Sequence, residues 1–246
     1  CDPSAVCDQA DISFTVTPAN DLPVANDDNG GSLTEDGPNG TINVVSNDTD
    51  VDGDPTTPTN GVGQFTVDLN TGLAGVQTTI TNAQGVWTYN PATGVVTFDP
   101  AINFNGVATL PYELCDPSNG CDQANISFSV TSVNDAPVAT NDNGGTLTED
   151  GANGTINIIA NDTDVDGNPT APTNGVGQFV VDLDPGTPGV QTTVTDAQGV
   201  WTYNVNTGVV TFDPAANFNG TATLTYELCD PGAVCDQADI SFGVTA

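Results

Sequence analysis

The sequence is one unit of 114 residues, written out more than twice. The phrase Cys-Asp-Pro begins at Cys1, Cys115 and Cys229, at intervals of 114 residues. Other landmarks keep the same interval, such as the tetrapeptide Thr-Glu-Asp-Gly at residues 34–37 and 148–151. A fixed period indicates a tandem array, in which each copy is one structural module. Such an array is typical of a stalk, fibre or adhesin, because an enzyme rarely needs its whole body copied in series.

The charge of the chain excludes several classes of partner. It contains no Lys, Arg or His against 32 Asp and Glu, which gives a formal net charge of −32. Nucleic-acid binding and attachment to anionic membranes both depend on basic side chains, so neither is expected. No apolar run approaches the ~20 residues that span a bilayer, so membrane insertion is not expected either. Self-repulsion opposes compaction. Either the acids form a solvated surface, or bound cations offset them, and the clustering of the acids favours cations.

Strand signals dominate the modules. Short alternating runs rich in Val, Ile, Thr and Phe occur at residues 11–16, 65–69, 94–98 and 108–114. Turn residues are frequent, with 27 Gly and 17 Pro, and this frequency opposes long helices. The pattern predicts an all-β protein built from antiparallel β-sandwich domains arranged end to end. Trp87 and Trp201 recur inside such runs and are expected to be core residues rather than a sugar-binding platform.

Proline-containing segments mark the expected domain boundaries. Pro23 and Pro137 each follow an alternating run, in the phrases Asn-Asp-Leu-Pro and Asn-Asp-Ala-Pro. We expect one β-sandwich repeat at residues 20–133 and a second at 134–246. Residues 1–19 then correspond to the C-terminal strand or hairpin arm of a preceding repeat. This arm is either a window cut from a longer array or a strand donated into a neighbouring subunit.

The cysteines occur as three matching pairs with the spacing C-x5-C. A zinc site would need a C-x2-C spacing or a histidine, and the chain has neither. The spacing therefore favours a local disulfide that closes a hairpin loop. Disulfides persist in oxidising compartments, so the chain is expected to be extracellular. The expected pairs are Cys1 with Cys7, Cys115 with Cys121, and Cys229 with Cys235.

The densest acidic run is Asn-Asp-Thr-Asp-Val-Asp-Gly-Asp at residues 47–54. Its three alternating carboxylates, Asp48, Asp50 and Asp52, are expected to converge if the run is extended. Oxygen ligands followed by a turn glycine suit a hard cation such as Ca²⁺. The run matches the opening of an EF-hand loop, but the twelfth position is Thr59 rather than Glu and no flanking helices are predicted. An EF-hand is therefore not expected.

The order of these motifs resembles the cadherin repeat. An Asn-Asp-x-Pro linker at residues 20–23 is followed by Glu35, a Gly-Thr pair at 40–41 and an Asp-x-Asp at 48–50. As a whole, the module looks most like the bacterial cadherin-like and Ig-like tandem repeats of large calcium-binding surface adhesins. In the cadherin family, Ca²⁺ lies at the domain junctions. One departure is that Pro and Ala follow Asp99 where cadherins have Arg and Glu. This difference favours one or two ions per junction rather than three.

The resemblance implies a set of metal ligands for each junction. The first junction would use Asn20, Asp21, Glu35, Asp48, Asp50 and Asp116. The second would use Asp99, Asn134, Asp135, Glu149, Asp162, Asp164 and Asp230. Asp52 and Asp166 are assigned to a loop site.

The expected function is that of an extracellular structural repeat in a bacterial surface adhesin or filament. Calcium at the junctions would stiffen the array, and the partners would be neighbouring repeats. Two alternatives stay open: an adhesive module that binds polysaccharide or a surface, and a donor-strand-linked subunit of a polymeric fibre. An enzyme is not expected, because the chain has no His or Lys base and no Ser in a nucleophile motif.

Overall fold

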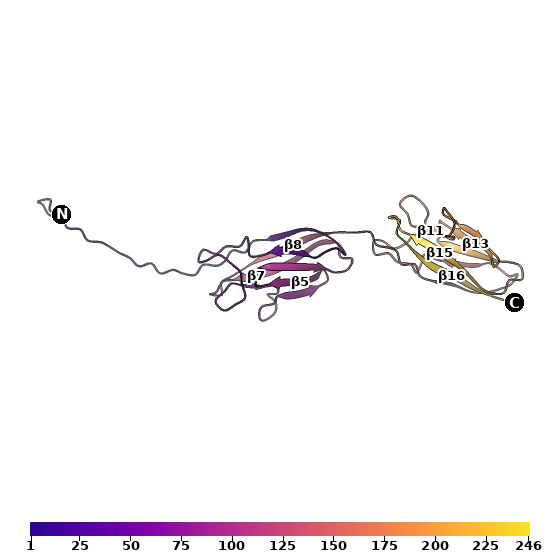
Figure 1. The fold of residues 1–246 in the computed structure, drawn as a ribbon, viewed down its shortest axis with the longest axis horizontal. Coiled ribbons are helices and arrows are strands. Elements are labelled where there is room, and N and C mark those ends of the chain that lie inside the picture. Colours follow the sequence, from indigo (N-terminus) through magenta and orange to yellow (C-terminus); the bar gives the residue numbers. More distant parts are fainter. The chain divides into compact units, whose positions relative to one another are not determined.

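The computed structural model describes residues 1–246, which divide into two compact units at Ser132 and Val133. In each unit, eight strands form two four-stranded sheets, so the predicted all-β fold is confirmed (Figure 1). The first unit is called module 1 and the second module 2. No helix that could span a membrane is present.

The two sheets of module 1 divide its strands evenly. The first sheet has the order β1-β8-β7-β3 and the second the order β2-β6-β5-β4. The strands are β1 (Asp28–Thr34), β2 (Gly40–Asn43), β3 (Thr66–Asp68), β4 (Thr79–Asn82), β5 (Gly85–Asn90), β6 (Val95–Pro100), β7 (Gly106–Cys115) and β8 (Cys121–Thr131).

Module 2 repeats this topology. Its sheets have the orders β9-β16-β15-β11 and β10-β14-β13-β12. The strands are β9 (Asp142–Thr148), β10 (Gly154–Asn157), β11 (Val180–Asp182), β12 (Thr193–Thr195), β13 (Gly199–Asn204), β14 (Val209–Pro214), β15 (Gly220–Cys229) and β16 (Cys235–Thr245).

One strand pair in each module departs from the antiparallel expectation. Strand β1 lies parallel to β8, with Asp28 opposite Ile126 and Thr34 opposite Thr131. The pair is parallel because the chain enters the module at one end and leaves it at the other. The first and last strands therefore run in the same direction. We call the end that carries residues 20–23 and the β7–β8 hairpin loop the linker end, and the end that carries Thr131 the far end.

The core lies between the two sheets and is aromatic at its centre. Trp87 is fully buried and stacks on Phe98 with a centroid distance of 4.0 Å, and Phe98 stacks on Phe128 at 5.5 Å. A Cβ atom built on Gly30 would lie 2.0 Å from Phe128 Cε1, so strand β1 can approach the ring only with glycine at this position. The same residues recur in module 2, and the expectation that the tryptophans belong to the core is confirmed.

Residues 11–16 do not form the strand that their alternation predicts. No strand is assigned there, and the side chains of Ile12, Phe14 and Val16 are 84–88% exposed. The matching residues of strand β8, such as Ile126 and Phe128, are fully buried between neighbours. The sequence pattern is the same, but a strand also needs hydrogen-bonded partners. Strands β7 and β1 supply these partners to β8, and nothing pairs with residues 11–16.

Candidate metal site

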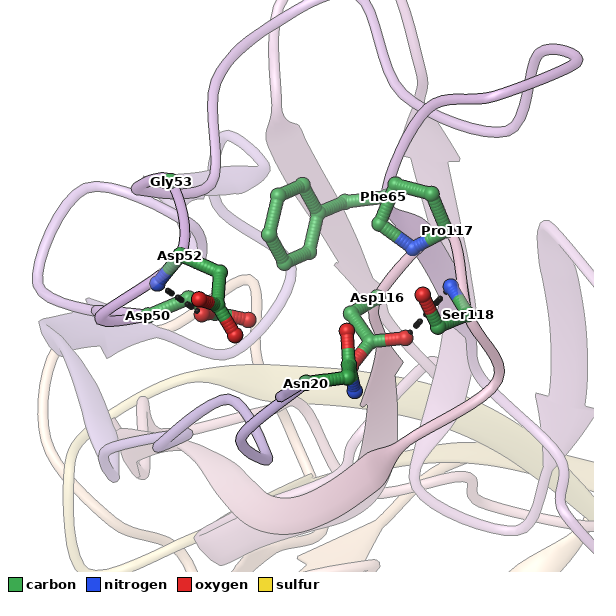
Figure 2. A pocket seen from close by; sticks show the side chains of 8 residues that line it. All are labelled: Asn20, Asp50, Asp52, Gly53, Phe65, Asp116, Pro117 and Ser118. Carbon is green, nitrogen blue, oxygen red and sulfur yellow. Dashed lines mark hydrogen bonds between the residues drawn. The ribbon is translucent and has the colours of Figure 1, made fainter. Parts of the chain in front are cut away.

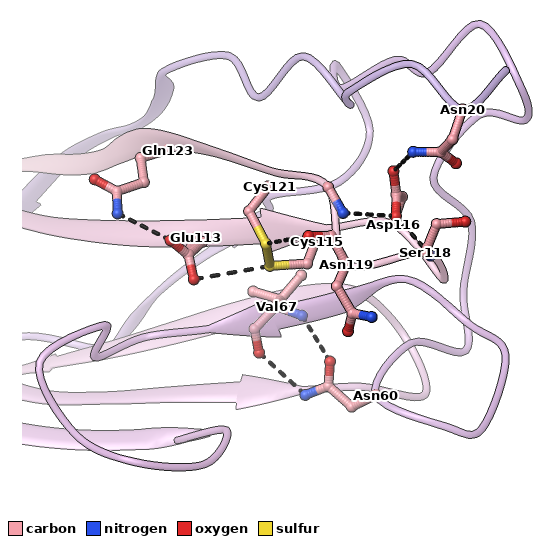
Figure 3. The surroundings of a disulfide bond; sticks show 11 residues. Asn20, Asn60, Val67, Glu113, Cys115, Asp116, Ser118, Asn119, Cys121 and Gln123 are labelled. Atoms are coloured by element: carbon pink, nitrogen blue, oxygen red, sulfur yellow. Dashed lines mark hydrogen bonds between the residues drawn. A yellow bond between two sulfur atoms is a disulfide. The ribbon is translucent and has the colours of Figure 1, made fainter.

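The β7–β8 hairpin loop at the linker end is held closed by a disulfide. Cys115 lies opposite Cys121 in the strand register, and the two form a disulfide (Figure 3). The predicted pairings Cys1–Cys7 and Cys229–Cys235 are also present, and no cysteine is free. Each disulfide spans only six residues and so fixes the shape of one loop, not the association of the two sheets.

Asp116 is the acceptor at the centre of this loop. Its Oδ1 accepts the backbone N–H of Ser118 at 2.6 Å and that of Gly120 at 2.9 Å, while its Oδ2 accepts the amide of Asn20 at 2.7 Å (Figure 3). Burial opposes the charge, but the hydrogen bonds from Asn20, Gly120 and Ser118 together hold the pKa of Asp116 below its usual value. The carboxylate therefore stays ionised and joins the linker to the hairpin loop.

The acidic run at residues 47–54 supplies a second side of the site. After a bridge between Thr49 and Val24, the chain turns so that the Asp52 N–H donates to Asp50 Oδ1 at 2.8 Å. Asp52 Oδ2 in turn accepts the backbone N–H of the linker residue Asp21 at 2.7 Å. The linker of module 1 is thus hydrogen-bonded to the β7–β8 hairpin loop and to the acidic run of its own module. These two segments are called the acidic loops.

The two acidic loops and the linker enclose a cavity of about 230 Å³ at the linker end (Figure 2). Acidic and amide side chains face one another across it, beside the ring of Phe65. Its lining is Asn20, Asp50, Asp52, Gly53, Phe65, Asp116, Pro117 and Ser118.

Module 2 carries the same site at the matching positions. Its cavity is lined by Asn134, Asp164, Asp166, Gly167, Phe179, Asp230 and Pro231. The hydrogen bonds repeat as well. Asn134 donates to Asp230 at 2.6 Å, and the Asp135 N–H donates to Asp166 at 2.8 Å. Asp164 Oδ2 is buried and has no hydrogen-bond partner. A buried carboxylate oxygen without a partner is costly unless a cation neutralises it, so these residues fit a hard cation with oxygen ligands.

The structure does not bring every predicted ligand to this cavity. Asp48 does not line it. It is directed into the module, where it accepts the Asn26 N–H at 2.7 Å and contacts the Tyr112 hydroxyl. The expected convergence of three alternating side chains therefore fails at its first member, because the chain is extended only around Thr49. Asp162 repeats this arrangement through Thr140 and Tyr226.

Two further predicted ligands lie at the far end of module 1. The Glu35 N–H donates to the carbonyl of Thr131, at the end of strand β8 opposite to Asp116. Asp99 lies near the end of strand β6 and is exposed, and the loop after it bonds to Glu35 through Asn105. Glu35 therefore cannot join Asn20 and Asp116 in one site of the same module, contrary to the ligand set expected for the first junction. Glu149 has the matching position in module 2.

Several contributors to the site were not predicted. The N–H groups of Ser118 and Gly120 orient Asp116, but backbone donors leave no mark in a sequence. Phe65, the apolar wall of the cavity, begins the alternating run at residues 65–69, and its lower burial relative to Val67 cannot be inferred from alternation alone.

The fold and the site together define a tandem pair of Ig-like, cadherin-like β-sandwich domains with acidic loops at the linker end. The family profile described as bacterial Ig domain matches residues 20–129 and again 134–243. The chain therefore belongs to the bacterial Ig domain family.

Solved structures share the fold. The extracellular domain of protocadherin gamma B4 has 19% identity and a TM-score of 0.51, with 93% of this chain and 33% of that chain covered. Protocadherin gamma C5 EC1-3 has 16% identity and a TM-score of 0.50, with 91% and 68% covered. Mouse cadherin-23 EC22-24 has 15% identity and a TM-score of 0.49, with 92% and 64% covered. The chain thus spans less than two thirds of two of these three structures. Among curated proteins, none matches the chain.

Proposed function

We propose that this chain is an extracellular, non-catalytic structural array whose modules bind Ca²⁺ at the linker end and are stiffened by it, as part of a bacterial surface adhesin or filament. The observation that carries the proposal is the repeated acidic cavity, in which the same linker asparagine, loop aspartates and hairpin aspartate meet in both modules. Its partners in this proposal are neighbouring repeats.

Calcium would act on the linker because linker residues belong to the site. Asn20 and Asp21 are already bonded to the hairpin loop and the acidic loop of module 1. Without metal, like charges ~4 Å apart repel by about 1 kcal/mol even in water, which loosens these loops. An ion held by Asp50, Asp52 and Asp116 would reverse that repulsion and fix the linker to the module.

The composition supports an extracellular calcium-dependent role. The chain has no basic side chain that could offset its acids, and its three disulfides suit an oxidising compartment. Extracellular calcium modules bind their ions with dissociation constants of about 10⁻⁴ to 10⁻³ M. With a Kd of about 10⁻⁴ M, 10 mM Ca²⁺ would stabilise each module by about 2.7 kcal/mol.

The test compares two variants of the full chain by calorimetric Ca²⁺ titration and by X-ray scattering. Asp52→Asn with Asp166→Asn removes one carboxylate from each cavity, and we expect at least a tenfold loss of Ca²⁺ affinity. Asp54→Asn is the control for module 1, because position 54 corresponds to Asn168 in module 2. Both side chains accept the backbone N–H of the residue four positions earlier, Asp50 and Asp164. It removes one charge from the acidic run of module 1, at a position that does not line the cavity, and should change the affinity of that module less than twofold.

Stiffening is read from the scattering data. We expect the wild-type chain to show a narrower distribution of interatomic distances in Ca²⁺ than in chelator, and the Asp52→Asn/Asp166→Asn variant to resemble the chelated protein. If the wild-type profiles with Ca²⁺ and with chelator coincide, the stiffening role is refuted even if the ion binds.

A further inference from the structure

A second oxygen cluster lies inside each module, separate from the cavity at the linker end. In module 1 it consists of Asp28 at the start of strand β1, Asp48 in the acidic run and Tyr112 in strand β7. Asp28 is 4% exposed, Asp48 is 5% exposed and Tyr112 is fully buried. Two carboxyl groups in a protein interior need neutralisation, because burying an unpaired charge is strongly unfavourable.

The cluster has more acceptors than donors, although the Asn26 N–H donates to Asp48 Oδ1 at 2.7 Å. The Tyr112 hydroxyl lies 3.0 and 3.3 Å from the two carboxyl oxygens of Asp48, 3.1 Å from the carbonyl of Val44 and 3.3 Å from that of Asn26. A hydroxyl has a single hydrogen and can satisfy one of these oxygens at a time. The Oδ2 atom of Asp28 is buried and has no hydrogen-bond partner at all.

Asp28 faces the same group of atoms. Burial, followed by the charge of Asp48, raises the pKa of Asp28 to about 7, and hydrogen bonds from Tyr112 and Asn47 oppose that rise. Burial and the charges of Asp48 and Asp28 likewise raise the pKa of Tyr112 far above its usual range, so the phenol stays protonated. The chain has no Lys, Arg or His, so no side chain can serve as the counter-ion.

Module 2 has a matching cluster around Tyr226. The Tyr226 hydroxyl lies 3.2 and 3.1 Å from the carboxyl oxygens of Asp162 and 3.1 Å from the carbonyl of Ile158. Asp142 is 5% exposed, and its Oδ2 also lacks a partner.

The convergence of these oxygens suits a metal ion. Calcium binds six to eight oxygens at 2.3–2.6 Å. The carboxyl oxygens of Asp48 and the carbonyl of Val44 all lie 3.0–3.3 Å from one atom, the Tyr112 hydroxyl oxygen. Carboxylates and a carbonyl also match the ligand types that calcium prefers, and a divalent ion would cancel both negative charges.

We propose that Asp28, Asp48 and the carbonyl of Val44 bind one Ca²⁺ inside module 1, and that Asp142, Asp162 and the carbonyl of Ile158 bind another inside module 2. This internal site shares no residue with the cavity at the linker end. It would fasten the first strand to the acidic run and to the turn after strand β2, and so stabilise the module itself rather than its linker.

Counting bound ions tests the internal site in the full chain by equilibrium dialysis against ⁴⁵Ca²⁺. Asp28→Asn with Asp142→Asn should lower the number of bound ions by two per chain, whereas the control Asp54→Asn should leave it unchanged. The Ca²⁺-dependent rise in melting temperature should also shrink in the Asp28→Asn/Asp142→Asn variant. If the ion count and the Ca²⁺-dependent rise in melting temperature were both unchanged, the proposal would be overturned. A shared proton would then be the only occupant of the internal cluster.

A second variant keeps the test valid if the first does not fold. In Asp52→Asn/Asp166→Asn the cavity at the linker end is weakened but the internal cluster is intact. We expect this variant to retain two ions per chain. Loss of all binding in this variant would overturn the internal site and support the linker-end site. Retention of all binding would overturn the linker-end site and support the internal site. The two proposals therefore fail separately.

Discussion

Replacing Asp28 and Asp142 by Asn is expected to stabilise both modules at neutral and alkaline pH when no divalent cation is present. Each wild-type carboxyl group is buried beside another carboxyl and has an oxygen without a partner. Asn keeps the shape of the side chain and removes the charge. The substitution should therefore raise the free energy of unfolding by removing the electrostatic cost of the buried charge in the wild-type protein.

The pKa of Asp28 gives the size and sign of the effect. Moving it from 3.8 to about 7 corresponds to at most about 4 kcal/mol per module. Because the folded-state pKa lies above the unfolded one, the folded module binds the proton more tightly between these values. Stability from Asp28 is then fully present below pH 3.8 and is lost as the pH rises to about 7. The pKa of Asp142 is raised to about 7 for the same reasons, burial and the charge of Asp162.

Urea denaturation in the presence of chelator, at several pH values from 5 to 8, measures this prediction. The wild-type free energy of unfolding should fall as the pH rises through this range, since Asp48 is also buried and its pKa is raised mainly by burial. The double Asn variant should fall less and should be the more stable protein at pH 8. A variant that is less stable than wild type at pH 8, with an unchanged pH dependence, would refute the reasoning.

Three other predictions address the fold. Replacing Cys115 and Cys121 by Ser should cost module 1 only about 2 kcal/mol in thermal denaturation, because the disulfide closes a short loop; loss of cooperative unfolding would show that it holds the sheets together. Gly144→Ala places a Cβ 2.0 Å from Phe242 Cε1 and should lower the melting temperature of module 2 sharply. The control Gly243→Ala, whose Cβ would have no atom nearer than 3.7 Å, should change the melting temperature little. Equal effects of the two substitutions would contradict the packing of strand β9. Deleting residues 1–18, all of them exposed, should leave the melting temperature of both modules within about 1 °C, and a larger fall would reveal a contact that supports module 1.

The sequence predicted the fold correctly where a spacing or pattern has a single structural interpretation. The period of 114 residues, the C-x5-C pairs and the alternating runs predicted the tandem sandwiches and their disulfides. The acidic run, the linker and the late aspartate predicted which segments meet at the linker end, and Asn20, Asp50 and Asp116 do meet there. Asp52, which the sequence assigned to a separate loop site, lines the same cavity.

Directions of side chains were not predictable from spacing. Asp48 and Asp50 are two residues apart and belong to one pattern, yet one is directed into the module and the other into the cavity, because the backbone turns after Thr49. Glu35 lies at the far end because strand β1 pairs with β8 from Ile126 to its last residue, Thr131, and only the strand pairing reveals this. The failure of residues 11–16 to form a strand has a related cause. Alternation predicts which face of a strand is apolar, but not whether a neighbouring strand is present to pair with it.

The most direct measurement for the central claim is anomalous X-ray diffraction from crystals of the full chain grown in CaCl₂. We predict a peak in each cavity at the linker end, with oxygens of Asp50, Asp52 and Asp116 in module 1 at about 2.3–2.6 Å from it, and the matching peak beside Asp164, Asp166 and Asp230. Cavities that contain only water at saturating Ca²⁺, with these carboxylates directed toward solvent, would contradict the account.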